Sequence, residues 1–231
     1  MDIHFLGHAA FSLSDGSDTV LIDPFLTGNP KAAASADEVD ATTILLTHGH
    51  ADHFGDTVDI AKRTHAPVVA IVEIANELGE EGLDVFDPNL GGTVKFDWGW
   101  VKLVPAWHTS TTPKGTVNTP AGLLVNFKDT LVYHLGDTAL FSDMELVAKR
   151  GNPIDVALMC IGGHYTMDRW DAVEAANRIG AKQVIPCHYG TFPPVETDAQ
   201  AFKADVEAAT NSEVVVLDPG QTHSVGAAVR G

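Results

Sequence analysis

The chain has 231 residues, of which 14 are Lys or Arg and 31 are Asp or Glu, so its formal net charge is -17. Hydrophobic residues make up 45% of the sequence and are spread along it, which excludes disorder as the main state, and two cysteines are too few for a disulfide scaffold. The acidic balance, without a cluster of Lys and Arg, excludes nucleic-acid binding by bulk charge, and no apolar run approaches the roughly 18 residues that a membrane span needs.

The first third of the chain is predicted to be rich in strands. Residues 57–64 are predicted to form a helix, because their pattern has helical period. Short apolar or alternating runs with β-branched residues predict strands at 3–6, 11–14, 19–23, 41–47 and 67–71.

The remainder is predicted to contain hairpins followed by alternating strands and helices. The hairpin strands are 92–96 with 101–104 and 123–127 with 131–135, and the later strands are 156–159, 183–186 and 213–217. Helices are predicted at 168–179 and 198–209, with Asp168 as the N-terminal cap of the first and Gly180 at its end. This order is typical of an α+β fold with two mixed sheets packed face to face, and no linker of different composition divides residues 1–231, so a single domain is expected.

The residues best suited to chemistry lie in one short segment directly after a predicted strand. Its sequence is His48-Gly49-His50-Ala51-Asp52-His53. Residues two apart in an extended segment point the same way, so His48 and His50 can present their imidazoles to one ion. Asp52 and His53 come where the chain leaves the strand and can face a second point nearby.

Further polar residues follow other predicted strands, each beside Gly or Pro. They are His108, Asp137, His164 and His188. Strand ends with small residues are where sheet folds assemble sites, so these are the candidates for completing a metal centre. A catalytic zinc-like site needs three or four ligands for each ion and an open coordination position.

The order of these donors resembles the metallo-β-lactamase superfamily, in particular its dinuclear hydrolases. The resemblance covers nearly the whole chain and implies an αβ/βα sandwich with the metals at one edge. Segments 6–9 (Leu-Gly-His-Ala), 162–167 (Gly-Gly-His-Tyr-Thr-Met) and 186–191 (Pro-Cys-His-Tyr-Gly-Thr) resemble one branch of it. That branch includes uncharacterised bacterial metal-dependent hydrolases, a sugar-lactone hydrolase and a phospholipase acting on N-acyl phosphatidylethanolamine.

Carried over position by position, the resemblance implies two divalent metal ions per chain, either Zn, Mn or Ni. His48, His50 and His108 would hold the first ion. Asp52, His53 and His188 would hold the second, and Asp137 would bridge the two. A hydroxide shared by the ions would cleave a small phosphodiester, ester or lactone, with Asp52 as a catalytic residue that orients the hydroxide or moves its proton.

The sequence also suggests roles for four residues outside the implied ligand set. His164 is expected to be catalytic, either facing the substrate or donating a proton. His8 is open between a site role, as a substitute metal ligand, and packing beneath the active-site edge. Asp23 is open between a hydrogen bond to a ligand histidine and a turn at a strand end. Lys114 is a candidate cation for a phosphodiester substrate.

The alternative function is a non-haem di-iron redox protein of the same fold, since some superfamily members bind iron with these ligands and reduce oxygen or nitric oxide beside a flavin. A structural metal site is disfavoured, because such sites are closed and usually rich in thiolates. Residues 1–4 lack the basic and apolar regions of a signal peptide, so we expect a cytoplasmic enzyme. Its partner would be a small-molecule substrate, and a homo-oligomer is left open.

Overall fold

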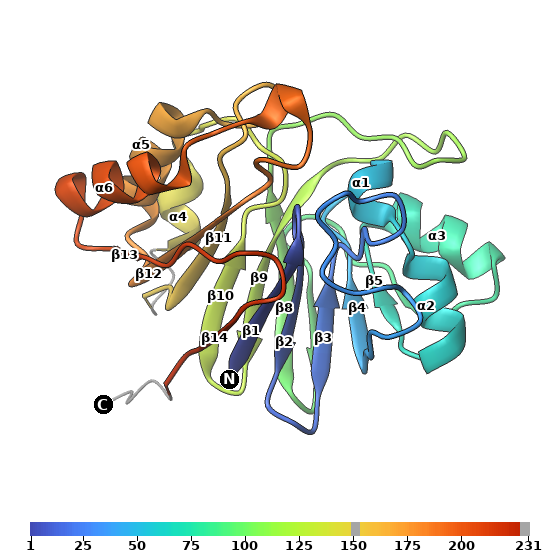
Figure 1. The fold of residues 1–231 in the computed structure, drawn as a ribbon. Coiled ribbons are helices and arrows are strands. Elements are labelled where there is room, and N and C mark those ends of the chain that lie inside the picture. Colours follow the sequence, from blue (N-terminus) through green and yellow to red (C-terminus); the bar gives the residue numbers. More distant parts are fainter. Residues whose placement is uncertain (149–152, 227–231) are drawn as a thin grey trace.

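The chain folds into two mixed β-sheets that pack face to face, with helices on the outer sides (Figure 1). The structure is a computed structural model and describes residues 1–148 and 153–226. The two packed sheets with helices on their outer sides confirm the predicted αβ/βα sandwich. Among the described residues, no helix combines the length and the apolar character needed to cross a membrane.

The first sheet is built from the N-terminal part of the chain and one late strand. Its strand order is β14-β1-β2-β3-β4-β5-β6, with antiparallel pairs from β14 to β3 and parallel pairs from β3 to β6. The strands are β1 (Asp2–Gly7), β2 (Ala10–Ser14), β3 (Thr19–Ile22), β4 (Thr43–Leu45), β5 (Val68–Val69), β6 (Val85–Phe86) and β14 (Thr222–Ser224). The helices of this half are α1 (Ala51–Phe54), α2 (Thr57–Thr64) and α3 (Val72–Glu80).

The second sheet has the order β13-β12-β11-β10-β9-β8-β7, with parallel pairs from β13 to β10 and antiparallel pairs from β10 to β7. Its strands are β7 (Thr93–Phe96), β8 (Gly99–Pro105), β9 (Ala121–Phe127), β10 (Thr130–His134), β11 (Val156–Cys160), β12 (Gln183–Cys187) and β13 (Glu213–Val214). The helices of this half are α4 (Met144–Ala148), α5 (Arg169–Ile179), η1 (Pro193–Val195) and α6 (Ala199–Ala209).

The main core lies between the sheets and takes fully buried side chains from both, such as Phe11 and Leu45 from the first and Val125 from the second. His134 on β10 also joins the halves, because its Nε2 lies 3.1 Å from the carbonyl oxygen of Ala9. A second core fills the space between β10–β12 and helices α5 and α6. The loops that follow β4, β8, β10 and β12 meet at one edge of the sandwich (Figure 1).

Three strands are shorter than predicted by three residues or more, among them 67–71, which is regular only over Val68–Val69, and helices α1, α3 and α4 were not predicted. Predicted strand 41–47 is regular only over Thr43–Leu45, and 213–217 only over Glu213–Val214. Helix α3 was not predicted, because its start continues an apolar, β-branched run from β5 and its N-cap, Ile71, makes no side-chain cap. By contrast, the Asp168 cap is confirmed: its Oδ1 accepts hydrogen bonds from the backbone N–H groups of Trp170 and Asp171 at 2.9 Å.

Candidate metal centre

Metal-binding side chains from distant parts of the sequence meet at this edge of the sandwich. They divide into groups whose ligand atoms all lie within 4.8 Å of one another. The groups are His48, His50 and His108; His8, Asp52, His53 and His188; and His48, His53 and Asp137. The structure thus brings together the seven residues that the family resemblance implies as metal ligands, together with His8, whereas His164 is in none of these groups.

The first group follows β4 and β8. Nε2 of His48 lies 3.1 Å from Nδ1 of His50, as expected for imidazoles two residues apart that face one point. The hydroxyl oxygen of Thr47 lies 3.0 Å from Nδ1 of His48. With Nδ1 occupied in this way, Nε2 of His48 is the atom left to bind an ion.

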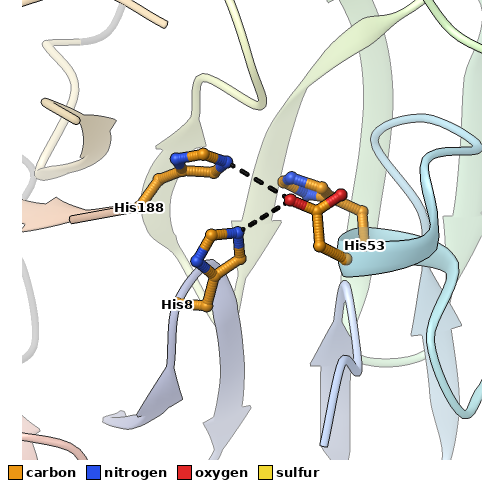
Figure 2. A group of neighbouring side chains, drawn as sticks. His8, His53 and His188 are labelled. Carbon is orange, nitrogen blue, oxygen red and sulfur yellow. Dashed lines mark hydrogen bonds and ion pairs between the residues drawn. The ribbon is translucent and has the colours of Figure 1, made fainter. Parts of the chain in front are cut away.

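The second group combines residues from the β1–β2 turn, helix α1 and the loop after β12. Figure 2 shows the rings of His8, His53 and His188 turned toward a common space. Nε2 of His8 lies 3.0 Å from Oδ2 of Asp52, and Nε2 of His188 lies 3.7 Å from the same oxygen. The donors of this group therefore converge on one carboxylate.

Asp137 lies between the two groups. Its Oδ1 is 3.3 Å from Nε2 of His53, and its Oδ2 is 3.1 Å from Nε2 of His188. Oδ2 is also 3.6 Å from Nε2 of His108 and 4.0 Å from Nε2 of His48. This carboxylate, with only 3% of its surface exposed, is within reach of ions bound on either side.

Several donor atoms in the cluster are buried without a hydrogen-bond partner. Within the described residues these include Nε2 of His53, Nε2 of His188 and Oδ1 of Asp137. Buried polar atoms without a partner are costly, and bound cations would satisfy them. Imidazole and carboxylate ligands without any thiolate suit divalent first-row ions, so the residues present fit such ions.

The carboxylates of the cluster raise the pKa of some of its histidines, whereas burial lowers the pKa of others. Burial alone would lower the pKa of His53, but the carboxylates of Asp137 and Asp23 outweigh it and raise the pKa well above its usual value. In the same way burial is outweighed at His188, where Asp137 raises the pKa to about 9. Burial prevails at His48, whose pKa lies well below its usual value. Of these three rings, the two with raised pKa values are the two nearest to Asp137.

Asp23, at the end of β3, fixes the orientation of two donor histidines. Its Oδ2 accepts a hydrogen bond from Nδ1 of His53 at 2.7 Å and another from the Thr47 hydroxyl at 2.6 Å. Since that hydroxyl proton goes to Asp23, the Thr47 oxygen accepts from Nδ1 of His48. Of the two roles left open for Asp23, the structure shows the hydrogen bond to a histidine of the cluster.

His8 contacts the cluster through both its side chain and its backbone. Its Nδ1 lies 2.9 Å from the Thr191 hydroxyl, and its carbonyl oxygen accepts a hydrogen bond from the backbone N–H of His188 at 2.7 Å. Burial lowers the pKa of His8 to about 4, against the effect of its hydrogen bond with Asp52. A neutral ring that donates from Nε2 to Asp52 accepts the Thr191 proton at Nδ1.

Comparison with known proteins identifies the family of this chain. A sequence profile of the beta-lactamase superfamily domain matches residues 2–188. The chain belongs to the metallo-β-lactamase superfamily. Among its relatives in this superfamily is a UPF0173 metal-dependent hydrolase of Pelotomaculum thermopropionicum, 45% identical over 227 residues that cover 96% of this chain and 99% of the relative. Another, from Thermus thermophilus, is 47% identical over 203 residues, which cover 87% and 89%.

Solved structures share the fold of this chain. Igni18, a metallo hydrolase from Ignicoccus hospitalis, superposes with a TM-score of 0.88 at 33% identity, covering 97% of this chain and 99% of that chain. CmlA, a diiron β-hydroxylase from Streptomyces venezuelae, has a TM-score of 0.74 at 17% identity, with 97% of this chain matching 54% of that one, and shares the fold alone. The relation to the sugar-lactone hydrolase and to the phospholipase stays a prediction.

A cavity of about 580 Å³ lies beside the donor cluster. Two residues that the sequence suggested as substrate contacts, His164 and Lys114, do not line it. His164 is exposed, and its ring packs edge-on against Tyr165 at a centroid distance of 4.6 Å. It is Tyr165 that lines the cavity. Lys114 instead forms an ion pair with Glu81. The suggested contact of Lys114 with a phosphodiester stays a prediction.

Proposed function

We propose that this protein is a metal-dependent hydrolase that uses two divalent cations, either Zn, Mn or Ni, to cleave a small ester, lactone or phosphodiester. The observation that carries the proposal is the set of buried donor atoms that converge around Asp137, several of them without a hydrogen bond. The names of the relatives, which are metal-dependent hydrolases, support the same reaction class.

The ligands proposed for each ion follow the grouping of the donors. His48, His50 and His108 would hold the first ion. Asp52, His53 and His188 would hold the second, because their ligand atoms form a separate group with His8. Asp137 would be shared, since its two oxygens face histidines of both groups.

When bound, the two cations supply an acidified water as nucleophile and electrostatic stabilisation of the leaving oxygen. The chain itself supplies orientation. Asp52 lines the cavity, so we propose that it orients the attacking water or takes its proton. His8 acts as a positioning residue: both of its ring nitrogens already have protein partners, Thr191 and Asp52, so it holds the Asp52 carboxylate in place.

His164 is proposed to act on the substrate from outside the metal cluster. It lies in the loop between β11 and α5, next to the cavity residue Tyr165. We expect His164→Ala to lower kcat about 10- to 100-fold while the metal content stays unchanged, because the ring touches none of the metal-binding donors. Loss of metal from this variant, measured by elemental analysis, would show that the assignment is wrong.

The direct test is elemental analysis combined with a substrate panel. Purified protein is expected to hold two divalent ions per chain and to hydrolyse at least one of bis-nitrophenyl phosphate, nitrophenyl acetate and a sugar lactone with Mn, Zn or Ni. A protein that binds no metal under any of these conditions would contradict the proposal. Tightly bound iron with a charge-transfer absorption band, and no hydrolysis, would favour the di-iron redox alternative.

A further inference from the structure

The cavity beside the donor cluster has an apolar wall. Apart from the metal-binding side chains and Thr109, its lining residues are Phe25, Ala51, Tyr165, Phe192, Pro194 and Val195. In the described part of the chain, neither Lys nor Arg lines it. Small-molecule sites of this composition bind apolar substrate groups and fix orientation through a few polar contacts.

The two phenylalanines of this wall are packed in place against the donor cluster. The rings of Phe25 and Phe192 meet the His8 ring edge-on, at centroid distances of 5.8 and 5.7 Å. Their own centroids are 6.5 Å apart. Because His8 is 1% exposed and contacts Asp52, the apolar wall directly adjoins the proposed ligands of the second ion.

The loop that carries Phe25 is held by the two residues that follow helix α1. A side chain at Gly55 would bring its Cβ within 2.4 Å of the carbonyl oxygen of Pro24, so the close approach of the loop requires glycine there. Oδ2 of Asp56 accepts hydrogen bonds from the backbone N–H groups of Leu26 and Thr27, at 2.9 and 2.8 Å. The wall is therefore preformed, which lowers the entropic cost of binding an apolar group.

We propose that this centre acts on a neutral carboxylic ester or lactone that carries an apolar substituent, and that Phe25 and Phe192 bind this substituent. This inference rests on the function proposed above and narrows its substrate class. A phosphodiester is an anion that proteins usually bind with Arg or Lys in addition to any metal ions, and the described cavity lining offers neither side chain. Hydrolysis consumes one water: its oxygen bonds to the acyl carbon, the ester C–O bond breaks, and the leaving oxygen takes a proton, giving an acid and an alcohol.

The kinetic test uses two homologous series of neutral esters, methyl alkanoates and alkyl acetates, with chains of increasing length. In at least one series, kcat/KM of the metal-loaded enzyme should rise about three- to fourfold for each added methylene that the wall buries. Phe192→Ala should flatten this dependence, and Phe192→Leu should restore most of it. Phe86→Ala is the matched control, because Phe86 is a partly exposed phenylalanine on β6 that does not line the cavity.

The binding test uses methyl ketones of the same chain lengths, which have no leaving group. Calorimetry on metal-free and metal-loaded protein should show affinity that increases with chain length in both forms and is lost in Phe192→Ala. Hydrolysis without chain-length dependence, or a higher kcat/KM for dibutyl phosphate than for butyl acetate, would overturn the substrate class and leave the hydrolase assignment standing. Length-dependent ketone binding by a metal-loaded protein that cleaves no ester, lactone or phosphodiester would overturn the proposed function instead.

Discussion

At the level of single residues, the chemistry depends most on Asp137. Its two carboxylate oxygens lie within 4.0 Å of imidazole nitrogens from both groups of donors. Burial acts to raise its pKa, but His188 and His53 outweigh burial, so its pKa lies well below the usual value. The carboxylate is therefore ionised at neutral pH and is ready to bind cations on either side.

Replacing this carboxylate should separate metal binding from folding. Asp137→Ala is expected to hold fewer than two ions per chain. Mutation of a residue that only orients a ligand usually lowers activity by roughly 10- to 100-fold, and we expect a larger loss here. Circular dichroism should still report a folded protein, because Asp137 lies at the edge of the sandwich. Asp59→Ala, on the exposed face of α2, is the control. Full metal content and normal turnover in Asp137→Ala would remove the bridging role.

His8 is expected to behave as a positioning residue and not as a ligand. His8→Ala should keep both ions while kcat falls about 10- to 100-fold, and His8→Gln, which retains an N–H donor, should recover part of that loss. Thr191→Val should act in the same direction, because it removes the partner of Nδ1. The decisive measurement is the visible spectrum of the Co²⁺-substituted protein: a changed spectrum or a lost ion in His8→Gln would identify His8 as a ligand.

At the level of elements, the ends of two parallel strands are fastened together beneath the cluster. Asp23, which follows β3, accepts hydrogen bonds from the backbone N–H and the hydroxyl of Thr47, which follows β4. The same carboxylate orients His53. Sheet geometry and metal binding are therefore coupled through one buried side chain.

Asp23→Asn should weaken both the link between the strand ends and the orientation of His53. If the amide oxygen takes the place of Oδ1 and accepts from the backbone N–H of Thr47, the NH₂ group takes the place of Oδ2 and faces Nδ1–H of His53, which loses its acceptor. We expect metal affinity to fall about 10- to 100-fold and the free energy of unfolding to fall by about 1–3 kcal/mol. Asp56→Asn is the matched control for metal affinity: its carboxylate also binds backbone N–H groups, but it contacts no metal-binding donor, so stability should fall while metal affinity stays the same. Equal metal affinity in the two variants would contradict this role for Asp23.

Elements with strong local signals were predictable, and elements that depend on distant contacts were not. Helices α5 and α6 begin after Asp168 and Asp198, whose side chains cap them, and the predicted ranges differ from the observed ones by one residue. The two-residue strand β6, which was not predicted, is defined by its pairing with β5 and has little signal of its own.

The same distinction applies to the candidate site. Alternation after a strand, together with the family resemblance, indicated His48, His50 and the donors after other strands. No local pattern indicates that His8 contacts Thr191, which is 183 residues away, or that Thr47 orients a histidine. These contacts arise only when the two sheets pack and bring their edges together.

At the level of the whole molecule, pH should affect the stability of the metal-free and metal-loaded proteins in opposite directions. The pKa of His188 is raised from 6.5 to about 9 in the folded chain, and that of His53 is also raised. A raised pKa gives stability that is complete below the unfolded value and is lost as pH rises through the folded value. Between pH 6.5 and about 9, histidines with lowered pKa values, such as His48, are largely neutral in both states and contribute little.

Metal-free protein should therefore lose thermal stability as pH rises from 6.5 to about 9. A cation must displace the protons on His53 and His188, so metal affinity should rise over the same interval, by up to roughly tenfold per pH unit for each proton released. At a fixed excess of Zn²⁺ or Mn²⁺ the loaded protein should gain stability, because a ligand that binds only the folded state stabilises it by RT ln(1 + c/Kd), where c is the free ligand concentration, and this stabilisation grows as Kd falls. Scanning calorimetry of both forms across this interval makes the comparison. Parallel pH profiles would show that the protonated histidines and the cations do not share one site.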